Sequence, residues 1–341
     1  MPNERPLAGR KAWLITDDKI GMQVQVRGVA DALGLDWQLK QVAPKGLWKM
    51  LAPFGPVDPK ERFSTPGTPF APPWPDVALA TGRASIPYVR ALRRKAGLAT
   101  FTVVLQDPRT GPKTADLIWV PEHDKRRGAN VMTTLTAAHS FTAERLRKLA
   151  ANEPAWLRDL PGPRIAIILG GPNQVYRFTA EDDARFAASI ASIAGLGASF
   201  MITPSRRTHA GLRDAVLAAT ASAPRFVWDT TGENPYPAFL AHADGFVVTG
   251  DSVNMSGEPL VTGKPVWIFE PSGGSAKFAR FHQALRDYGA TRSLPETVTS
   301  LEPWTYPPLD AAAAIAREVE TRWLRRRAML SGTANGGKDG I

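Results

Sequence analysis

The stretch ADGFVVTGDSVNMSGEPLVTGKPVWIFEP, which spans residues 243–271, decides the fold that we expect for this chain. Residues 245–249 are an apolar run with the length and β-branched content of a buried strand. A turn of Gly, Asp and Ser follows, and a helix should begin near Asn254 with Glu258 about one turn inside it. Residues 266–269 form a second apolar strand, so the order of elements is that of a parallel α/β sheet.

The turn at residues 250–252 has two interpretations. A strand that runs into a helix through Gly, Asp and Ser leaves backbone N–H groups at the positive end of a helix dipole, where phosphate binds. A carboxylate shortly afterwards, here Glu258, can then reach a ribose hydroxyl, as acidic residues do in dinucleotide-binding folds. The alternative is an ordinary strand–turn–helix in which Ser252 caps the helix, and the stretch alone does not separate the two.

Composition limits the class of protein. A chain of 341 residues is long enough for two hydrophobic cores, and 43% hydrophobic with 22% charged residues is typical of a globular protein. No apolar run approaches the ~18 residues of a membrane span, and no apolar stretch of signal-peptide length precedes the first strand, so we expect a cytoplasmic protein. The absence of cysteine excludes disulfides, thiol nucleophiles and cysteine-based metal sites.

The net charge of +10 indicates an anionic partner: nucleic acid, a phosphorylated substrate or an anionic lipid surface. No segment has the signature of an RNA-recognition motif, a zinc finger or a helix-turn-helix, so we expect no nucleic acid partner.

Strand and helix patterns alternate along the chain and restart after residues 150–163, which carry three prolines and look like a linker. This organisation predicts an α/β protein with two doubly wound, Rossmann-like domains facing a cleft, at residues 1–155 and 162–307. A helix over residues 308–330 should pack back on the first domain, and the Gly-rich residues 331–341 should be a disordered tail.

Most predicted strands end in a polar cluster. In open parallel sheets ligands bind at the carboxyl ends of the strands, so clusters at these ends predict a ligand-binding rim on each sheet. The clusters are Asp17 with Lys19, Gly82 with Arg83, Asp107 with Arg109, Glu122 with His123 and Asp124, Gly170 with Gly171, Ser205 with Arg206 and Arg207, and Asp251 with Ser252.

The chain resembles the bacterial branch of the family named after the plant elongated-mitochondria fission factor. The matching segments are DDKIGMQVQVRGVADALGL (17–35), PDVALATGR (75–83), VLQDPR (104–109), DLIWVPEHD (116–124), ILGGPN (168–173), ITPSRRT (202–208), NPYPAFLAHAD (234–244) and VVTGDSVNMSGEPLVTGKPV (247–266). This family is in turn similar to glycosyltransferases of the two-Rossmann-domain (GT-B) type. The resemblance implies that fold, with a nucleotide-sugar donor on the second domain and an acceptor on the first.

The second domain carries residues suited to a nucleoside-diphosphate sugar. Two glycines after a strand would let the backbone approach a diphosphate, and arginine can grip phosphate oxygens bidentately. The alternative for the arginines is a surface ion-pair face. The predicted donor-binding residues are Gly170, Gly171, Ser205, Arg206, Arg207, Thr208, Asn234, Tyr236, Asp251, Ser252, Ser256 and Glu258.

An inverting sugar transfer needs a base that takes the proton of the acceptor hydroxyl. Glu122, His123 and Asp124 are the candidates, since they join a histidine with two carboxylates, and Asp17 competes with them. Three adjacent residues cannot easily face one ion and no HxxxH pattern is present, so we expect no metal. The first strand lacks GxGxxG after it, which argues against a redox dinucleotide, and no cofactor is expected.

Residues of the first domain suggest where the acceptor binds. Lys19, Gly21, Gln25, Arg83, Asp107 and Arg109 are the predicted acceptor-binding residues. Arg90, Arg93 and Arg94 on a helix over residues 85–96, and a basic run at residues 322–327, could rest on anionic lipid, although either could be a solvated helix face. With the net charge, they favour a lipid-linked or envelope acceptor at the inner face of the cytoplasmic membrane.

The sequence therefore predicts a glycosyltransferase-like protein. Two alternatives stay open: a non-catalytic scaffold or recruitment protein that retains the fold, as the role of the plant namesake in fission implies, and a sugar-nucleotide epimerase of the same fold.

Overall fold

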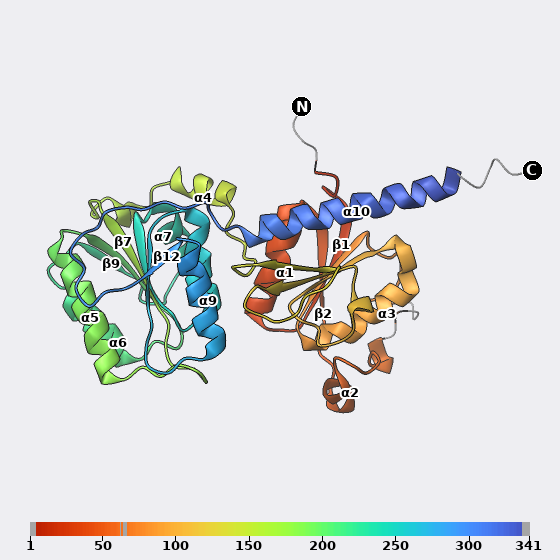
Figure 1. Ribbon diagram of the computed structural model, residues 1–341, viewed down its shortest axis with the longest axis horizontal. Helices are drawn as coiled ribbons and strands as arrows, with labels where there is room; N and C mark the ends of the chain where they lie inside the picture. Colours follow the sequence, from red (N-terminus) through yellow and green to blue (C-terminus); the bar gives the residue numbers. More distant parts are fainter. Residues whose placement is uncertain (1–4, 62, 64–66, 336–341) are drawn as a thin grey trace, which may run out of the picture. The chain divides into compact units, whose positions relative to one another are not determined.

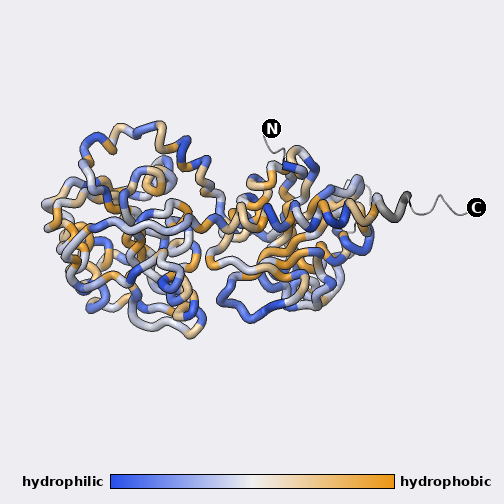
Figure 2. Tube along the Cα trace, turned by 45° about the horizontal axis from the view of Figure 1, so that its top comes forward, coloured by the Kyte–Doolittle hydropathy of each residue, from blue (hydrophilic) through white to orange (hydrophobic). Residues whose placement is uncertain are grey.

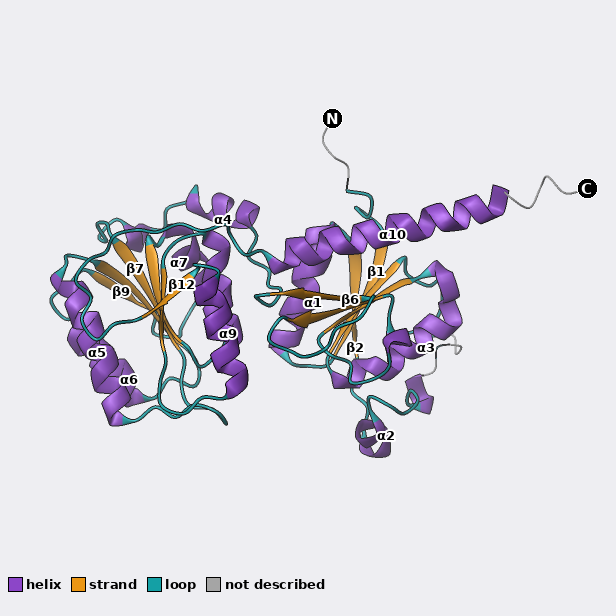
Figure 3. Cartoon of the chain, in the orientation of Figure 1, coloured by secondary structure: helices purple, strands orange, loops and turns teal. Residues whose placement is uncertain are grey.

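A computed structural model describes residues 5–61, 63 and 67–335 of the chain. The chain forms two compact units (Figure 1). The first unit comprises Met1–Thr134, Ala138–Ser140 and Ala311–Ile341, and the second comprises Leu135–Ala137 and Phe141–Asp310. Each unit holds a six-stranded, fully parallel sheet flanked by helices (Figure 3), which confirms the predicted pair of Rossmann-like domains.

The sheet of the first unit has the strand order β2-β1-β3-β4-β5-β6. From β1 the chain crosses to β2 on one side of it, and β3 then pairs with the other side of β1 and is followed by β4, β5 and β6. The direction of strand order therefore reverses between β1 and β3, which is the topological switch point. The elements are β1 (Lys11–Thr16), α1 (Ile20–Leu33), β2 (Asp36–Gln41), α2 (Gly46–Leu51), β3 (Val77–Thr81), α3 (Ile86–Ala96), β4 (Phe101–Leu105), β5 (Leu117–Pro121), β6 (Val131–Thr134) and α10 (Ala311–Asn335).

The sheet of the second unit has the order β12-β11-β10-β7-β8-β9, with its switch point between β7 and β10. The elements are α4 (Ala143–Ala150), β7 (Arg164–Leu169), α5 (Ala180–Gly195), β8 (Ser199–Pro204), α6 (Ala210–Ala219), β9 (Arg225–Val227), α7 (Tyr236–His242), β10 (Gly245–Thr249), α8 (Val253–Gly257), β11 (Val266–Phe269), α9 (Ala276–Asp287) and β12 (Thr291–Ser293).

The central strands are buried along their whole length. Every residue of β3, β4 and β10 is buried, because helices cover a parallel sheet on both faces. Figure 2 shows the hydrophobic residues gathered in the interior of each unit. This double burial explains why these strands read in the sequence as continuous apolar runs.

The linker predicted at residues 150–163 is wrong. Leu157 and Leu160 are 0% and 2% exposed and belong to the core of the second unit, together with Phe141 and Leu146. The boundary between the units therefore falls at residues 135–141, earlier than the proline-rich segment. The prolines of this segment lie in loops of the second unit and not in a linker. The two leucines between them supply apolar surface that is buried in the core of the second unit.

The long C-terminal helix returns to the first unit, as expected. α10 packs against α1 and buries Ile315, Val319 and Trp323. The predicted disordered tail is wrong for residues 331–335, because adding residues to an existing helix costs far less than nucleating one; residues 336–341 lie outside the described residues. Among the described helices, none is at once long enough and apolar enough to cross a membrane.

Gly28 tests the packing of α1. A Cβ at this position would lie 2.4 Å from the backbone oxygen of His139. Although alanine is the better helix former by about 1 kcal/mol, we expect Gly28→Ala to lower the free energy of unfolding by about 1–3 kcal/mol, measured by urea denaturation. The matched control is Gly195→Ala in α5, where a Cβ meets no heavy atom within 4 Å and stability should stay equal or rise. Equal stability of the Gly28 variant and the wild type would contradict this close approach.

Candidate functional site

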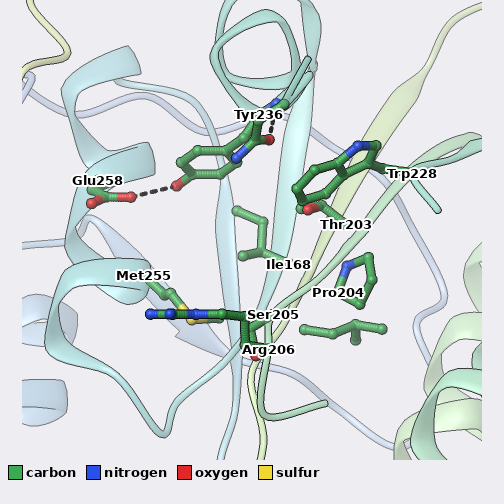
Figure 4. Close-up of a pocket in the computed structure, with 11 residues that line it drawn as sticks. Ile168, Thr203, Pro204, Ser205, Arg206, Trp228, Tyr236, Met255 and Glu258 are labelled. Carbon is green, nitrogen blue, oxygen red and sulfur yellow. Dashed lines mark hydrogen bonds between the residues drawn. The ribbon is translucent and has the colours of Figure 1, made fainter. Parts of the chain in front are cut away.

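A cavity of about 380 Å³ opens at the carboxyl ends of the strands in the second unit (Figure 4). The ends of β7 and β8, the loop after β9, and α7 and α8 all contribute to its wall, which places it next to the switch point of the sheet. Its lining residues are Ile168, Leu169, Thr203, Pro204, Ser205, Arg206, Trp228, Asn234, Tyr236, Met255 and Glu258. Five of the predicted donor-binding residues are therefore brought together: Ser205, Arg206, Asn234, Tyr236 and Glu258.

A hydrogen-bonded pair of acidic groups forms one wall of this cavity. The hydroxyl of Tyr236 donates to Oε2 of Glu258 at 2.9 Å, and the ring of Phe141 packs edge-on against Tyr236 with 5.6 Å between centroids. Burial raises the pKa of Glu258 to about 7, although the hydrogen bond from Tyr236 opposes this shift. Burial also raises the pKa of Tyr236 well above its ordinary value, so the tyrosine stays protonated. Glu258 can therefore exchange a proton near neutral pH.

The helix that carries Glu258 differs from expectation. α8 ends at Gly257, and residues Glu258–Thr262 continue as a 3₁₀ helix. Pro259 has no backbone N–H, so it cannot make the bond that would extend the α-helix. The tighter 3₁₀ turn thus begins at Glu258, the residue whose carboxyl reaches the cavity.

Two further side chains face the cavity from different elements. Arg206 is exposed, and no hydrogen bond or ion pair joins its guanidinium to any residue that the structure describes. Trp228 follows β9 and is half-buried; its indole N–H donates to the backbone oxygen of Thr231 at 2.9 Å, which holds the ring in the cavity wall. Figure 4 shows Arg206, Trp228 and Glu258 around the cavity from three sides. A cation, an aromatic face and a carboxyl therefore converge on one space.

Several residues of the cavity were not predicted from the sequence: Ile168, Leu169, Thr203, Pro204, Trp228 and Met255. Most belong to strands or helices, where an apolar side chain looks the same in the sequence whether it faces a core or a cavity. Trp228 gave the one usable signal, since it stands at the end of a strand directly before the polar loop at residues 229–234.

Three other residues predicted to bind the nucleotide sugar, Gly171, Arg207 and Asp251, bind each other instead of lining the cavity. The side chain of Asp251 is 0% exposed and pairs with the Arg207 guanidinium, with Nη2 2.7 Å from Oδ2. Asp251 also accepts hydrogen bonds from the hydroxyl of Thr249 at 2.7 Å and from the N–H of Gly171 at 3.2 Å. The Arg207 Nη1 donates to the backbone oxygen of Gly171 at 2.7 Å. This network joins the loops that follow β7, β8 and β10.

The two glycines permit this close approach of loops. A Cβ on Gly170 would lie 2.0 Å from Oδ1 of Asp251, and one on Gly171 would lie 2.0 Å from the backbone oxygen of Arg207. Protein atoms occupy the space that a Cβ would need, so the contact between these loops by itself requires glycine at both positions. Arg207 and Asp251, also predicted for the donor, belong to this network and do not line the cavity.

The three remaining hydroxyl residues that were predicted to bind the nucleotide sugar are bonded to the protein or buried. Thr208 donates to the backbone oxygen of Gly170 at 2.7 Å. Ser252 caps α8, since its hydroxyl accepts from the N–H of Met255 at 3.4 Å, which is the capping alternative of the sequence analysis. Ser256 is 0% exposed and does not line the cavity.

The first unit has a cavity of about 240 Å³ at the carboxyl ends of β1, β3 and β4. Lys19, Arg83, Asp107 and Arg109, all predicted for the acceptor, line it. Its full lining is Lys19, Met22, Pro53, Gly82, Arg83, Ile86, Val104, Leu105, Gln106, Asp107, Pro108 and Arg109.

Gln25 and Gly21 do not line this cavity. Gln25 is buried behind the wall, where its side-chain oxygen accepts a hydrogen bond from Gln106 at 3.2 Å, and Gly21 is exposed on α1.

The two candidate bases occupy different places. Asp17 is 15% exposed, pairs with the ammonium of Lys19 at 3.5 Å, and lies beside Gly82, which lines the cavity. Glu122, His123 and Asp124 follow β5 and line neither of the two cavities described above. No set of three His, Asp or Glu side chains among the described residues is arranged to hold a metal ion.

The arginines of α3 differ from the expected membrane face. Arg93 pairs with the carboxylate of Asp116, which also binds Arg326 of α10 at 3.2 Å. Arg90 donates to the backbone oxygens of Pro53 and Phe54 at 3.2 and 2.8 Å. Only Arg94 of the three predicted arginines is exposed without an intramolecular bond to the residues described. Two of these side chains thus hold the fold together.

Residues 20–323 match the sequence profile of the family described as mitochondrial fission ELM1. The chain belongs to this family. It is 29% identical over 276 residues to the mitochondrial fission protein ELM1 of Arabidopsis thaliana, and 30% identical over 161 residues to the Rickettsia prowazekii (strain Madrid E) protein RP120. These matches cover 73% and 46% of this chain, and the chain spans 65% and 45% of the two relatives.

Solved structures share the fold of this ELM1-family chain. UDP-GlcNAc 2-epimerase from Methanocaldococcus jannaschii is 11% identical with a TM-score of 0.52, over 91% of this chain and 99% of that one. UDP-GlcNAc 2-epimerase from Neisseria meningitidis, bound to UDP-GlcNAc, is 11% identical with a TM-score of 0.50, over 92% of this chain and 100% of that one. At this identity the likeness shows the two-Rossmann-domain, GT-B-like fold alone.

The adjacent arginines of this ELM1-family chain should differ in their effect on stability. Arg207→Ala leaves the buried carboxylate of Asp251 without its charge partner, so we expect a loss of about 2–3 kcal/mol in the free energy of unfolding. Arg206→Ala, the matched control, should change it by less than about 0.5 kcal/mol. Urea denaturation of both variants measures the difference, and equal stabilities would show that the network does not join the loops.

The raised pKa of Glu258 predicts a pH dependence of stability. Between pH 4.5, its ordinary pKa, and about 7, the folded chain keeps a proton that the unfolded chain has lost, so stability falls as pH rises through this window. Glutamine at position 258 does not titrate, so the Glu258→Gln variant does not lose stability in this window. Its side-chain oxygen still accepts the hydrogen bond from Tyr236. The difference in free energy of unfolding between the variant and the wild type should therefore shift in favour of the variant by up to about 3 kcal/mol from pH 4 to pH 8, measured by urea denaturation. A difference independent of pH would contradict the raised pKa.

Proposed function

We propose that this chain binds a nucleoside-diphosphate sugar in the cavity of its second unit and transfers the sugar to a lipid-linked or envelope acceptor bound by the first. The observation that carries the proposal is the convergence of Arg206, Trp228 and Glu258 on one cavity of about 380 Å³. Ligand cavities commonly measure roughly 300–1,000 Å³ and combine apolar walls with a few polar groups, as this one does.

Each part of the ligand has a matching side chain. Arg206 has donors available for diphosphate oxygens, which a guanidinium binds through two parallel hydrogen bonds. Glu258 can accept from a ribose hydroxyl, and the ring of Trp228 offers a flat apolar face for the base; Asn234 lines the same cavity. Ser205 adds a hydroxyl on the side of Arg206.

The place of the cavity in the fold supports the same ligand. Doubly wound sheets bind nucleotides at the carboxyl ends of their strands near the switch point, and the cavity lies there. The Neisseria meningitidis epimerase, which shares the fold, was solved bound to UDP-GlcNAc. Both points are analogies of fold, so the proposal depends on the side chains of this chain.

Asp17 is our candidate for the base of the transfer, because it lies beside the cavity of the first unit while Glu122, His123 and Asp124 do not. In this step Asp17 takes the proton of an acceptor hydroxyl, whose oxygen forms a bond to the anomeric carbon of the sugar. The bond from that carbon to the diphosphate breaks, and its electron pair leaves with the nucleoside diphosphate.

Calorimetry with a panel of nucleoside diphosphates and their sugars tests the donor site. Arg206→Ala should lose about 1.5–3 kcal/mol of binding free energy, or roughly 10- to 150-fold in affinity, because a charge-assisted contact to phosphate is lost. Trp228→Ala should weaken binding by removing the stacking face. Arg158→Ala, an exposed arginine of the same unit outside the cavity, is the matched control and should bind like the wild type.

The outcomes separate the alternatives. If the wild type binds no nucleotide of any base, the donor-binding proposal is wrong and the scaffold interpretation takes its place. If it binds a nucleotide sugar, product analysis distinguishes two reactions: a transferase releases nucleoside diphosphate, whereas an epimerase returns an isomer with the diphosphate still attached. Unchanged binding by Arg206→Ala and Trp228→Ala would place the nucleotide elsewhere.

A further inference from the structure

A group of apolar side chains projects from the first unit into solvent. Leu47, Met50 and Leu51 of α2, with Phe54 just after it, are 60%, 75%, 40% and 67% exposed; we call these four residues the apolar tip. α2 has no buried residue, and Figure 1 shows it standing away from the sheet of its unit. Four large apolar side chains gathered at one exposed segment are unusual on a soluble surface and mark an interaction site.

The apolar tip is held in place by the body of the unit. Arg83 donates to the backbone oxygen of Met50 at 2.7 Å, and Arg90 donates to the backbone oxygen of Phe54 at 2.8 Å. The arginines leave the apolar side chains uncovered and bind only the backbone. Hydrogen bonds to its backbone therefore hold the tip in a position in which its apolar side chains are exposed.

The charged side chains within the segment that carries the apolar tip are cationic. Within residues 43–57 the only charged side chains are Lys45 and Lys49, and both are exposed. Phe54 also lines a cavity of about 420 Å³ in the first unit, which is separate from the acceptor-side cavity. The charged residues of this cavity are Arg90, Arg109 and Lys113. An apolar projection with a basic surround is complementary to a membrane whose interior is apolar and whose surface is anionic.

We propose that the first unit docks on an anionic lipid bilayer by inserting the apolar tip, with Lys45 and Lys49 at the headgroups and a lipid phosphate in the cavity of Arg90, Arg109 and Lys113. A lipid surface fits better than a protein partner, because the tip offers apolar side chains and long lysines that can extend to the headgroups, without the polar groups that set specificity between proteins.

The docking surface goes beyond the proposed function and does not depend on the nucleotide site. It does have a consequence for the acceptor. Pro53 and Arg83 connect the two features, since both line the acceptor-side cavity and Arg83 also binds the backbone of the tip. Docking by the tip brings this cavity to the membrane surface, where a lipid-linked acceptor would be present.

Flotation of the full chain with phosphatidylcholine vesicles, with and without phosphatidylglycerol, tests the proposal. The wild type should bind only the anionic vesicles and should be released by high salt. Leu47→Ser/Met50→Ser/Phe54→Ser should weaken binding about tenfold or more, and Lys45→Glu/Lys49→Glu should weaken it by at least about 25-fold, near fivefold for each lysine. The matched control is Leu98→Ser/Leu196→Ser, which removes two leucines that are 60% and 41% exposed elsewhere, and it should bind normally.

Insertion has a direct readout, because the chain has no cysteine. Met50→Cys carrying an environment-sensitive fluorophore should shift its emission to the blue on anionic vesicles, as the label enters the apolar layer. Leu196→Cys in the second unit, labelled in the same way, should not shift.

Three results would overturn the proposal: no binding to anionic vesicles, normal binding by the serine variant, or no emission shift at position 50. If the serine variant instead abolishes self-association of a wild type that ignores lipid, the tip is a contact between proteins. Calorimetry of the serine variant should give the nucleotide affinity of the wild type, so failure of the docking surface is distinguishable from failure of the donor site.

Discussion

The second unit depends on one buried carboxylate, that of Asp251. It lies at the switch point of the sheet, where the loops after β7, β8 and β10 must approach one another, and each loop supplies a partner or the space for one. Burying a charge is costly unless it is paired and hydrogen-bonded, so Arg207 and Thr249 are required once Asp251 is there. Gly170 and Gly171 are required for the same reason, because a Cβ at either would occupy the space of this contact.

This constraint separates the roles of the two adjacent arginines at the cavity. Arg207 binds within the protein, whereas its neighbour Arg206 lines the cavity and has no hydrogen bond to the residues that the structure describes. On the far side, burial holds the Tyr236–Glu258 pair in place and raises the pKa of the carboxyl to about 7. Packing and the hydrogen bond therefore position the Tyr236–Glu258 pair, whereas Arg206 is exposed and has no such restraint among the residues described.

The first unit uses much of its positive charge in the same way. Arg83 and Arg90 bind backbone oxygens of the segment around α2, while Arg93 and Arg326 share the carboxylate of Asp116. A net charge of +10 is therefore a poor guide to where an anion binds, since many of the cations are already engaged. The exposed Lys45 and Lys49 beside apolar side chains are the more informative feature, because neither ammonium pairs with any residue that the structure describes.

The two parallel sheets and the polar residues at their strand ends could be predicted from the sequence. Strands buried on both faces must be apolar throughout, and the turns after them need Gly, Asp or Ser, so both patterns are local and readable. Which of the polar residues line a cavity depended on the tertiary structure. Arg206 and Arg207 are neighbours in the chain, yet one binds Asp251, 44 residues away, and the other lines the cavity. Leu157 and Leu160 looked like part of a linker for the same reason: their partners lie in strands and helices distant in sequence, and only folding brings them together.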